Sequence, residues 1–222
     1  MISLICIGQK ESNIWYFGVE AGLDFNSGTP IPLTDGAMDQ FEGCASLADA
    51  NGDLLFYTDG MDVWNKNHLP MTNGSGLQGH LSSSQSAIIV PKPETDSIYY
   101  IFTVDVANNT FGGGPFGLSY SEVNINLSGG DGAVTTNKNI SLVTPTCEKL
   151  VATMHNNGTD VWVITHEWNS DAFYAYLITS NGVNSTAVIS NSGSYIGGNP
   201  NIFSYYMGYM KISPDGSKLA AV

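Results

Sequence analysis

Two short segments combine aromatic rings with histidine and amide side chains, a mixture suited to contacts with sugars or proteins. One runs from Trp64 to His68 as Trp-Asn-Lys-Asn-His, and the other begins at His166 as His-Glu-Trp-Asn. Indole rings offer flat apolar area, while histidine and asparagine add directed hydrogen bonds. Trp64, His68, His166 and Trp168 are therefore the candidate binding residues. The competing interpretation is that Trp64 and Trp168 pack in the core, between neighbouring structural units.

Signals for catalysis are weaker. The sequence contains no G-x-S-x-G nucleophile elbow and no C-x-x-C pair, and its four histidines are scattered. Glu42, Glu148 and Glu167 flank predicted strands, where paired carboxylates would suit a polysaccharide hydrolase or lyase. Hydrated strand ends explain the same glutamates. We therefore name no catalytic residue, expect a non-catalytic protein, and keep the polysaccharide enzyme as the alternative.

The segment from Asp49 to Asp53 places oxygen-bearing side chains at alternate positions, as calcium loops do. An EF-hand would need a glycine two places beyond Gly52 and a distal glutamate, and the sequence has neither. A hairpin turn through Asn51 and Gly52 explains these residues more simply. We expect no cofactor, with calcium as the alternative, and no metal site.

Charge restricts the partners. The 222 residues carry seven Lys and Arg against twenty Asp and Glu, for a formal net charge of −13. Such a chain repels a phosphate backbone, so nucleic-acid binding is not expected. No apolar stretch reaches the roughly 18 residues that a membrane-spanning helix requires, so we expect no membrane insertion. A protein or a glycan is the expected partner.

The elements that must position these residues are strands. Four pairs of apolar, β-branched runs flank turn-forming residues centred near positions 52, 96, 158 and 216. The Asn-Gly turn at Asn51 and Gly52 predicts a type I′ hairpin, with positive φ at both central residues. The other structural turns are expected at Asn157, Gly158, Asp215 and Gly216. The paired strands are residues 44–49 with 54–58, 86–90 with 98–104, 150–154 with 161–165, and 210–212 with 218–222. Further strands are predicted over 13–17, 62–64, 117–126 and 172–179.

Apolar hairpins that recur every 40 to 60 residues or so, each followed by another strand, are typical of β-propeller blades. The chain is predicted to be all-β and to form an incomplete propeller over residues 9–222, with about three blades and part of a fourth. A two-sheet β-sandwich is the alternative fold. Residues 1–8 form an apolar run that ends with a small residue. This pattern predicts a signal-peptide remnant. Cys44 and Cys147 are expected to be unpaired and buried.

Long segments at residues 13–30, 42–68, 84–93, 98–105 and 148–179 carry a family resemblance. They resemble the N-terminal region of large surface proteins of Bacteroidetes, which are often labelled gliding-motility-associated or type IX secretion sorting-domain proteins. The closing "GYMKISPDGSKLA" resembles the S-P-D-G-x-x-L turn of TolB-like and YVTN-like propeller repeats, which like WD repeats form blades. The resemblance implies a secreted or cell-surface, extracellular protein with a multi-blade propeller. The function expected from it is adhesion, or binding of a protein or glycan, within a larger protein.

Overall fold

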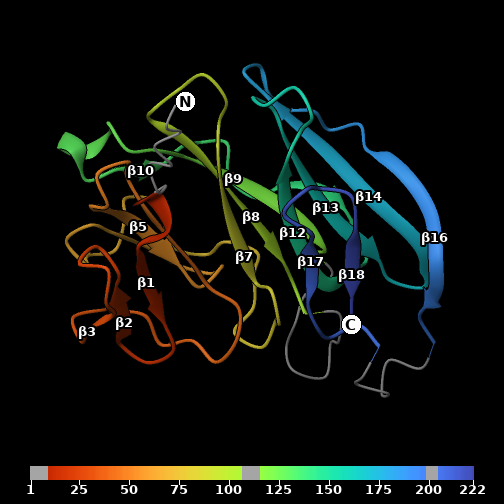
Figure 1. The fold of residues 1–222 in the computed structure, drawn as a ribbon, viewed down its shortest axis with the longest axis horizontal. Coiled ribbons are helices and arrows are strands. Elements are labelled where there is room, and N and C mark those ends of the chain that lie inside the picture. The colour runs from red at the N-terminus through yellow and green to blue at the C-terminus, as the bar shows by residue number, and fades with distance from the viewer. Residues whose placement is uncertain (1–9, 107–115, 199–204) are drawn as a thin grey trace, which may run out of the picture.

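The computed structural model describes residues 10–106, 116–198 and 205–222 (Figure 1). The signal-peptide remnant predicted over residues 1–8 lies outside these ranges. The chain is all-β, as predicted, and every pair of neighbouring strands is antiparallel. Among the described residues, helix is limited to the one-turn segments Lys10–Ser12 and Ser128–Gly130. None of these residues form a helix with the length and apolar character needed to cross a membrane.

The strands form five sheets that follow one another along the chain. The first sheet joins β1 (Ile14–Phe17), β2 (Ala21–Asp24) and β3 (Ile31–Leu33), and the second joins β4 (Ala45–Ala48), β5 (Leu54–Thr58) and β6 (Val63–Asn65). The third holds β7 (Ala87–Pro91), β8 (Ile98–Val104), β9 (Leu118–Asn124), β10 (Ala133–Val134) and β11 (Ile140–Val143). The fourth holds β12 (Thr146–Met154), β13 (Val161–Glu167), β14 (Ser170–Thr179), β15 (Gly182–Val183) and β16 (Val188–Ile196). The fifth is the hairpin of β17 (Met210–Ile212) and β18 (Leu219–Ala221).

Successive sheets meet through their first strands. β1 contacts β4, β4 contacts β7, β7 contacts β12, and β12 contacts β17. Figure 1 shows the first two sheets at the left, the third in the middle and the fourth at the right, with the β17–β18 hairpin drawn between β12 and β14. Each sheet thus packs against the next, and within the described residues no sheet closes on itself.

All four predicted hairpins are confirmed. They are β4–β5, β7–β8, β12–β13 and β17–β18, and the bounds of β5, β8 and β17 match the predicted ranges. The predicted number of repeating sheets, about three and part of a fourth, is wrong. The structure has five sheets, because a complete three-stranded sheet, β1–β3, precedes the first hairpin. Its second strand reads Ala-Gly-Leu-Asp and its third Ile-Pro-Leu, too short and too rich in Gly and Pro to predict strands.

The turn at Asn51 and Gly52 differs from the predicted type I′ hairpin. Gly52 has a φ of 91°, while Asn51 is not among the residues with positive φ. The Asp49 carboxylate explains this, because its Oδ1 accepts the backbone N–H groups of Asn51 at 2.8 Å and of Asp53 at 2.9 Å. The turn is therefore longer than two residues, and Gly52 alone supplies the left-handed backbone. The turns at Asn157–Gly158 and Asp215–Gly216 also place positive φ on the glycine, at 76° and 71°.

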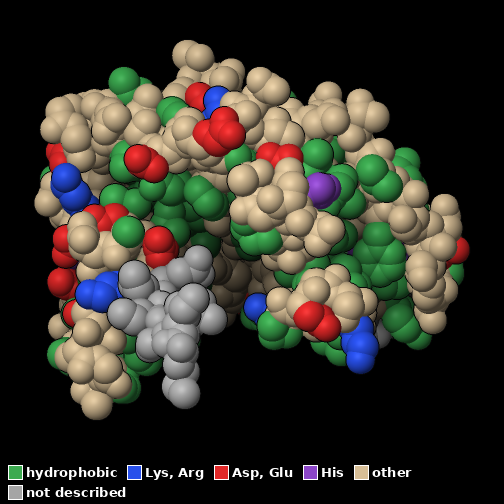
Figure 2. All heavy atoms as spheres, turned by 45° about the horizontal axis from the view of Figure 1, so that its top comes forward, with side chains coloured by type: hydrophobic (Ala, Val, Ile, Leu, Met, Phe, Trp, Pro, Cys, Tyr) green, Lys and Arg blue, Asp and Glu red, His purple; other side chains and the backbone are tan. Residues whose placement is uncertain are grey.

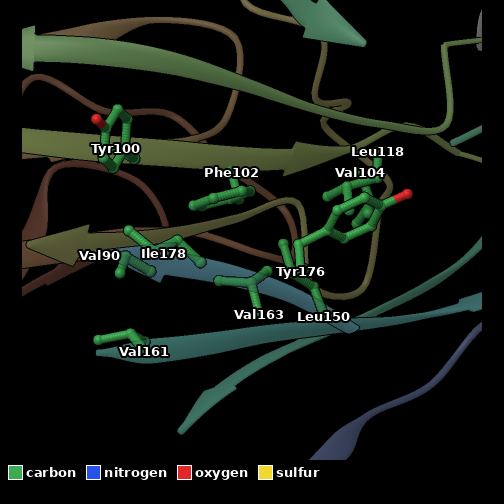
Figure 3. Packing of buried hydrophobic residues seen from close by; sticks show 10 residues of the cluster. All are labelled: Val90, Tyr100, Phe102, Val104, Leu118, Leu150, Val161, Val163, Tyr176 and Ile178. Carbon is green, nitrogen blue, oxygen red and sulfur yellow. The ribbon is translucent and has the colours of Figure 1, made fainter. Parts of the chain in front are cut away.

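The largest apolar cluster lies between the third and fourth sheets (Figure 3). β8 supplies Tyr100 and Phe102, which face Val163 of β13 and Tyr176 of β14. Phe102 is completely buried, and full burial of such a side chain contributes about 1.5–3 kcal/mol. The remaining members are Val90, Val104, Leu118, Leu150, Val161 and Ile178.

A second, polar cluster joins the sheets where their first strands meet. It is the segment Ser83–Ser86, which leads into β7 and is buried throughout. Gln85 Oε1 accepts the backbone N–H of Leu150 at 3.2 Å and that of Met210 at 2.7 Å, so one amide bridges the fourth and fifth sheets. Ser86 Oγ donates to the carbonyl of Asp59 at 2.8 Å, which ties the same segment to the second sheet. Because buried backbone groups need partners, these side chains fix how the sheets meet.

Substitution of Gln85 by alanine is expected to lower the free energy of unfolding by about 2–4 kcal/mol, because two buried N–H groups lose their acceptor. Urea unfolding measures the change. Gln78→Ala, on a half-buried loop, is the matched control and is expected to cost less than about 1 kcal/mol. Equal losses in the two variants would contradict the bridging role.

The buried tyrosines predict a loss of stability at alkaline pH. Burial, and then nearby acidic groups and tyrosines, raise the pKa of Tyr100 and of Tyr176 to about 12. Above about pH 10 the unfolded chain releases phenolic protons that the folded chain keeps, so stability falls as pH rises. Urea unfolding from about pH 9 to about pH 11 is expected to show this fall. Tyr100→Phe should make the slope shallower, and an unchanged slope would contradict the assignment.

Candidate functional site

Aromatic rings from the first two sheets form a continuous stack. Tyr16 of β1 stacks on Tyr57 of β5 with ring centroids 4.7 Å apart, and Tyr57 stacks on Trp64 of β6 at 5.5 Å. Tyr16 and Tyr57 are buried, whereas Trp64 is half-buried. β5 and β6 pair Tyr57 directly with Trp64, so the strand register itself sets this contact.

His68 closes the same cluster from a turn after β6. Its ring lies 5.2 Å from that of Tyr16 and 5.8 Å from that of Tyr57, between ring centroids. The side chain of Asn65 holds the turn, because its Oδ1 accepts the N–H groups of Asn67 at 2.9 Å and of Leu69 at 3.1 Å. His68 itself has a φ of 60°, a left-handed backbone that histidine adopts more often than most residues other than glycine.

Two polar contacts position the His68 imidazole. The Tyr57 hydroxyl oxygen accepts the N–H of Ala37 at 2.9 Å and lies 3.2 Å from His68 Nδ1. The Tyr57 hydroxyl can either donate to Nδ1 or accept from it, depending on the tautomer of His68. Nε2 faces Asp35 Oδ2 at 3.5 Å, and the Asp35 carboxylate also accepts the Tyr16 hydroxyl at 2.8 Å. Asp35 thus orients both the histidine and the tyrosine.

Burial decides what these groups can do. Burial, together with the hydrogen bond to Asp35, raises the pKa of Tyr16, and burial raises that of Tyr57. Both hydroxyls stay protonated and act as hydrogen-bond donors. The side chain of His68 is 24% exposed and that of Asp35 is 59% exposed. The cluster therefore presents to solvent an imidazole, a carboxylate and part of an indole on a rigid aromatic support.

The second predicted pair lies in another sheet. His166 is in β13 of the fourth sheet, only 1% exposed, and meets Phe173 edge to face at 4.5 Å. Trp168 follows β13, is 7% exposed, and packs against Tyr206 at 5.5 Å. The structure thus brings Trp64 and His68 together around Tyr57. His166 and Trp168 are buried elsewhere, and each lies near Cys147. The surroundings of Trp168 match the core-packing interpretation.

His166 also lies beside a cysteine. Cys147 Sγ is 3.7 Å from His166 Nδ1, and that nitrogen is 2.7 Å from the Glu167 carbonyl oxygen. Burial, opposed by Lys149 and helped by Glu148, raises the pKa of Cys147 to about 12, and burial lowers that of His166. Both groups are therefore neutral near pH 7. Cys147 is a free thiol, completely buried, and Cys44 is a free thiol that is half-buried.

The three glutamates considered for catalysis have different surroundings. Glu148 is completely buried, and its Oε2 accepts both the N–H and the hydroxyl of Ser84 at 2.9 Å. Glu42 is exposed and accepts the Ser82 hydroxyl at 3.3 Å. Glu167 is half-buried and accepts the Tyr174 hydroxyl at 3.2 Å. Glu148 is thus committed to the polar cluster that joins the sheets.

The oxygen-rich turn after β4 is occupied by its own hydrogen bonds. Burial alone would raise the pKa of Asp49, but N–H groups from Asp53 and Asn51 outweigh it and lower the value. In the part of the chain that the structure describes, no three His, Cys, Asp or Glu side chains are grouped so as to hold a metal ion. Asp49 therefore acts as the acceptor that shapes this turn.

Sequence reasoning missed three members of the site, namely Tyr16, Tyr57 and Asp35. The tyrosines were visible as aromatic residues within predicted strands, but their meeting depends on how two separate sheets pack. Asp35 lies in an irregular segment after β3, where no local pattern marks it. Long-range packing is thus the signal that the sequence lacks.

Cys147 is expected to resist alkylation. At about pH 8 a thiol with a pKa near 12 is almost entirely protonated, and the thiolate is the reactive form. Iodoacetamide labelling followed by mass spectrometry should modify Cys147 more slowly than Cys44 in the folded protein, and both rapidly in urea. Fast labelling of folded Cys147 would show that it is activated.

Comparison with known proteins identifies no relative of this chain. No family model, no curated protein and no solved structure matches it. The interpretation of the Trp64–His68 cluster therefore rests on its geometry and on the chemistry of its side chains.

Proposed function

We propose that this chain is a non-catalytic binding module of an extracellular β-propeller that uses the Trp64–His68 cluster to contact a protein or a glycan. The observation that carries the proposal is the support of a partly exposed His68 and Trp64 by two buried, stacked tyrosines. Rigid aromatic groups lose little entropy on binding, which is why they dominate recognition sites.

The order of the sheets supports a propeller. Each hairpin begins a new antiparallel sheet, and each first strand contacts the first strand of the next sheet. Propeller blades repeat in this way, with their innermost strands around a common axis. A two-sheet sandwich instead places its strands in two layers, and five successive sheets fit that scheme less well.

Three properties of the chain support an extracellular location. The chain is acidic, and its N-terminal apolar run ends with a small residue. Long segments also resemble Bacteroidetes surface proteins. Fractionation of cells producing the native protein tests this part. Recovery in the cytosol alone would overturn it without affecting the binding site.

The role of the cluster is tested by binding variants to an array of bacterial and host glycans. Trp64→Ala and His68→Ala are each expected to lower the affinity for any glycan that binds by at least about tenfold, because each removes a central contact. The matched control is Trp162 of β13, which is half-buried like Trp64 and whose ring lies 5.7 Å from that of His155. Trp162→Ala should leave binding unchanged.

Two outcomes count against the site. If Trp64→Ala and His68→Ala bind like the unaltered protein, the ligand contacts another surface. If Trp162→Ala weakens binding equally, the loss reflects general damage to the fold. A protein ligand is tested by the same variants in cross-linking on intact cells, with the same control.

A further inference from the structure

Asp35 gives the Trp64–His68 cluster a carboxylate with room for another partner. Its side chain is 59% exposed, and each of its two oxygens has one neighbour in the cluster. Oδ1 accepts the Tyr16 hydroxyl at 2.8 Å, and Oδ2 lies 3.5 Å from His68 Nε2. A carboxylate offers about four acceptor positions, so Asp35 can accept further hydrogen bonds from a ligand on its exposed side.

No basic side chain of the described residues neutralises Asp35. Its ion-pair contact is with His68, and no lysine or arginine forms one with it. Lys66, the lysine nearest to His68 in the sequence, is exposed and is not a partner of Asp35. A second carboxylate acts on the same place, because Asp24 as well as Asp35 helps burial to raise the pKa of Tyr16. The cluster therefore has a local excess of negative charge.

The surroundings of the cluster are acidic as well. Between Lys10 and Lys66 the sequence has ten Asp and Glu residues but no Lys or Arg, and this stretch contains all six strands of the first two sheets. Figure 2 shows more acidic than basic side chains on the half of the molecule that contains these sheets. A field of this sign repels glycans that carry carboxylate or sulfate groups and attracts cationic ones.

The indole of Trp64 supplies the apolar part of the site. Tyr57 covers one side of the ring, with the two ring planes inclined by only 15°, and the indole as a whole is half-buried. Its exposed part offers flat apolar area, and an aromatic ring also favours a nearby cation. His68, 24% exposed, adds an imidazole that can form hydrogen bonds with hydroxyl groups. The site thus combines groups that suit an apolar ring face, hydroxyls and a positive charge.

We propose that the Trp64–His68 cluster selects a hexosamine oligosaccharide with free amino groups, whose ammonium group pairs with Asp35 while a sugar ring packs on Trp64. This inference rests on the proposed function, because it names the ligand class of the same site. Hydrogen bonds between two ionised groups are about twice as strong as neutral ones, so the charge gives the selectivity. Each unit of such a chain carries an amine, so one amine can meet Asp35 whichever unit lies on Trp64.

Isothermal titration calorimetry with a glucosamine tetrasaccharide and its fully N-acetylated form tests the proposal, because acetylation removes the charge and keeps the sugar rings. The comparison is made at about pH 6.5, where a primary amine of this kind is protonated. The unaltered protein is expected to bind the free-amine form at least about tenfold more tightly. Raising the salt concentration to about 1 M should reduce this preference, because salt screens exposed charges.

Asp35→Asn is the decisive variant. Asparagine keeps the shape of the side chain and an acceptor oxygen for the Tyr16 hydroxyl but removes the charge, so the ratio of the two affinities should fall to about one. Asp39→Asn removes the same charge from an exposed position of the same segment and is the control, with a ratio expected to change less than about twofold. Trp64→Ala should weaken the binding of both oligosaccharides.

The outcomes separate this inference from the proposed function. If the acetylated form binds at least as tightly and Trp64→Ala weakens it, the selectivity for amines is wrong and the binding site stands. A preference for amines that survives in Asp35→Asn would place the charge contact elsewhere and overturn the inference. If neither oligosaccharide binds, the inference is wrong even where the site binds another glycan. Binding of a trilysine peptide that depends on Asp35, without binding of either oligosaccharide, would assign the site to a protein ligand.

Discussion

Four buried residues, Ser83 to Ser86, hold the sheets in one arrangement. Ser83 accepts the N–H of Gly43 at 3.1 Å and Ser86 bonds the carbonyl of Asp59, so the segment reaches the second sheet. Ser84 and Gln85 bond residues of the fourth and fifth sheets, while the segment itself continues into the third. A Cβ on Gly43 would come within 2.1 Å of the Ser86 nitrogen, so only glycine allows this approach. Because most of the partners are backbone groups at fixed positions, with the Glu148 carboxylate as the exception, this polar junction sets the geometry that the apolar faces then fill.

A charged side chain is buried beside this junction, on a residue between Glu148 and Leu150, which Ser84 and Gln85 contact. Lys149 is 1% exposed, yet its Nζ donates to the carbonyl oxygens of Tyr205, Tyr206 and Met207. Burial lowers the pKa of this lysine, and the three carbonyls offset part of the cost of removing it from water. Lys149 thereby fastens the segment before β17 to the start of β12. The fifth sheet, which is small and largely exposed, owes its position to Lys149 and Gln85.

The proposed binding site depends on the alternation of side chains along β1. Tyr16 is buried and supports His68, whereas Trp15 and Phe17 lie on the opposite face of the strand and are partly exposed. A strand presents two independent faces, each decided by what covers it.

The sequence by itself determined the all-β class, the four hairpins and the acidic character of the chain. Those features depend on local patterns, because β-branched and aromatic runs such as Ile98–Val104 and turn residues such as Gly216 act through their neighbours in sequence. The strand β16 escaped prediction because it is exposed along almost its whole length and carries no alternation of apolar and polar residues. β2 and β3 of the first sheet were missed for a related reason, since these short strands contain Gly and Pro.

Only the tertiary structure decided which chemistry-bearing residues meet. Trp64 and His68 were recognisable as types, but Tyr16 and Asp35 join them only because the first sheet packs against the second. Equally, nothing local distinguished Trp168, which is buried against Tyr206, from Trp64, which keeps part of its surface exposed. Exposure and contact between sheets depend on how whole faces pack, and that packing is a property of the assembled fold and not of any single segment.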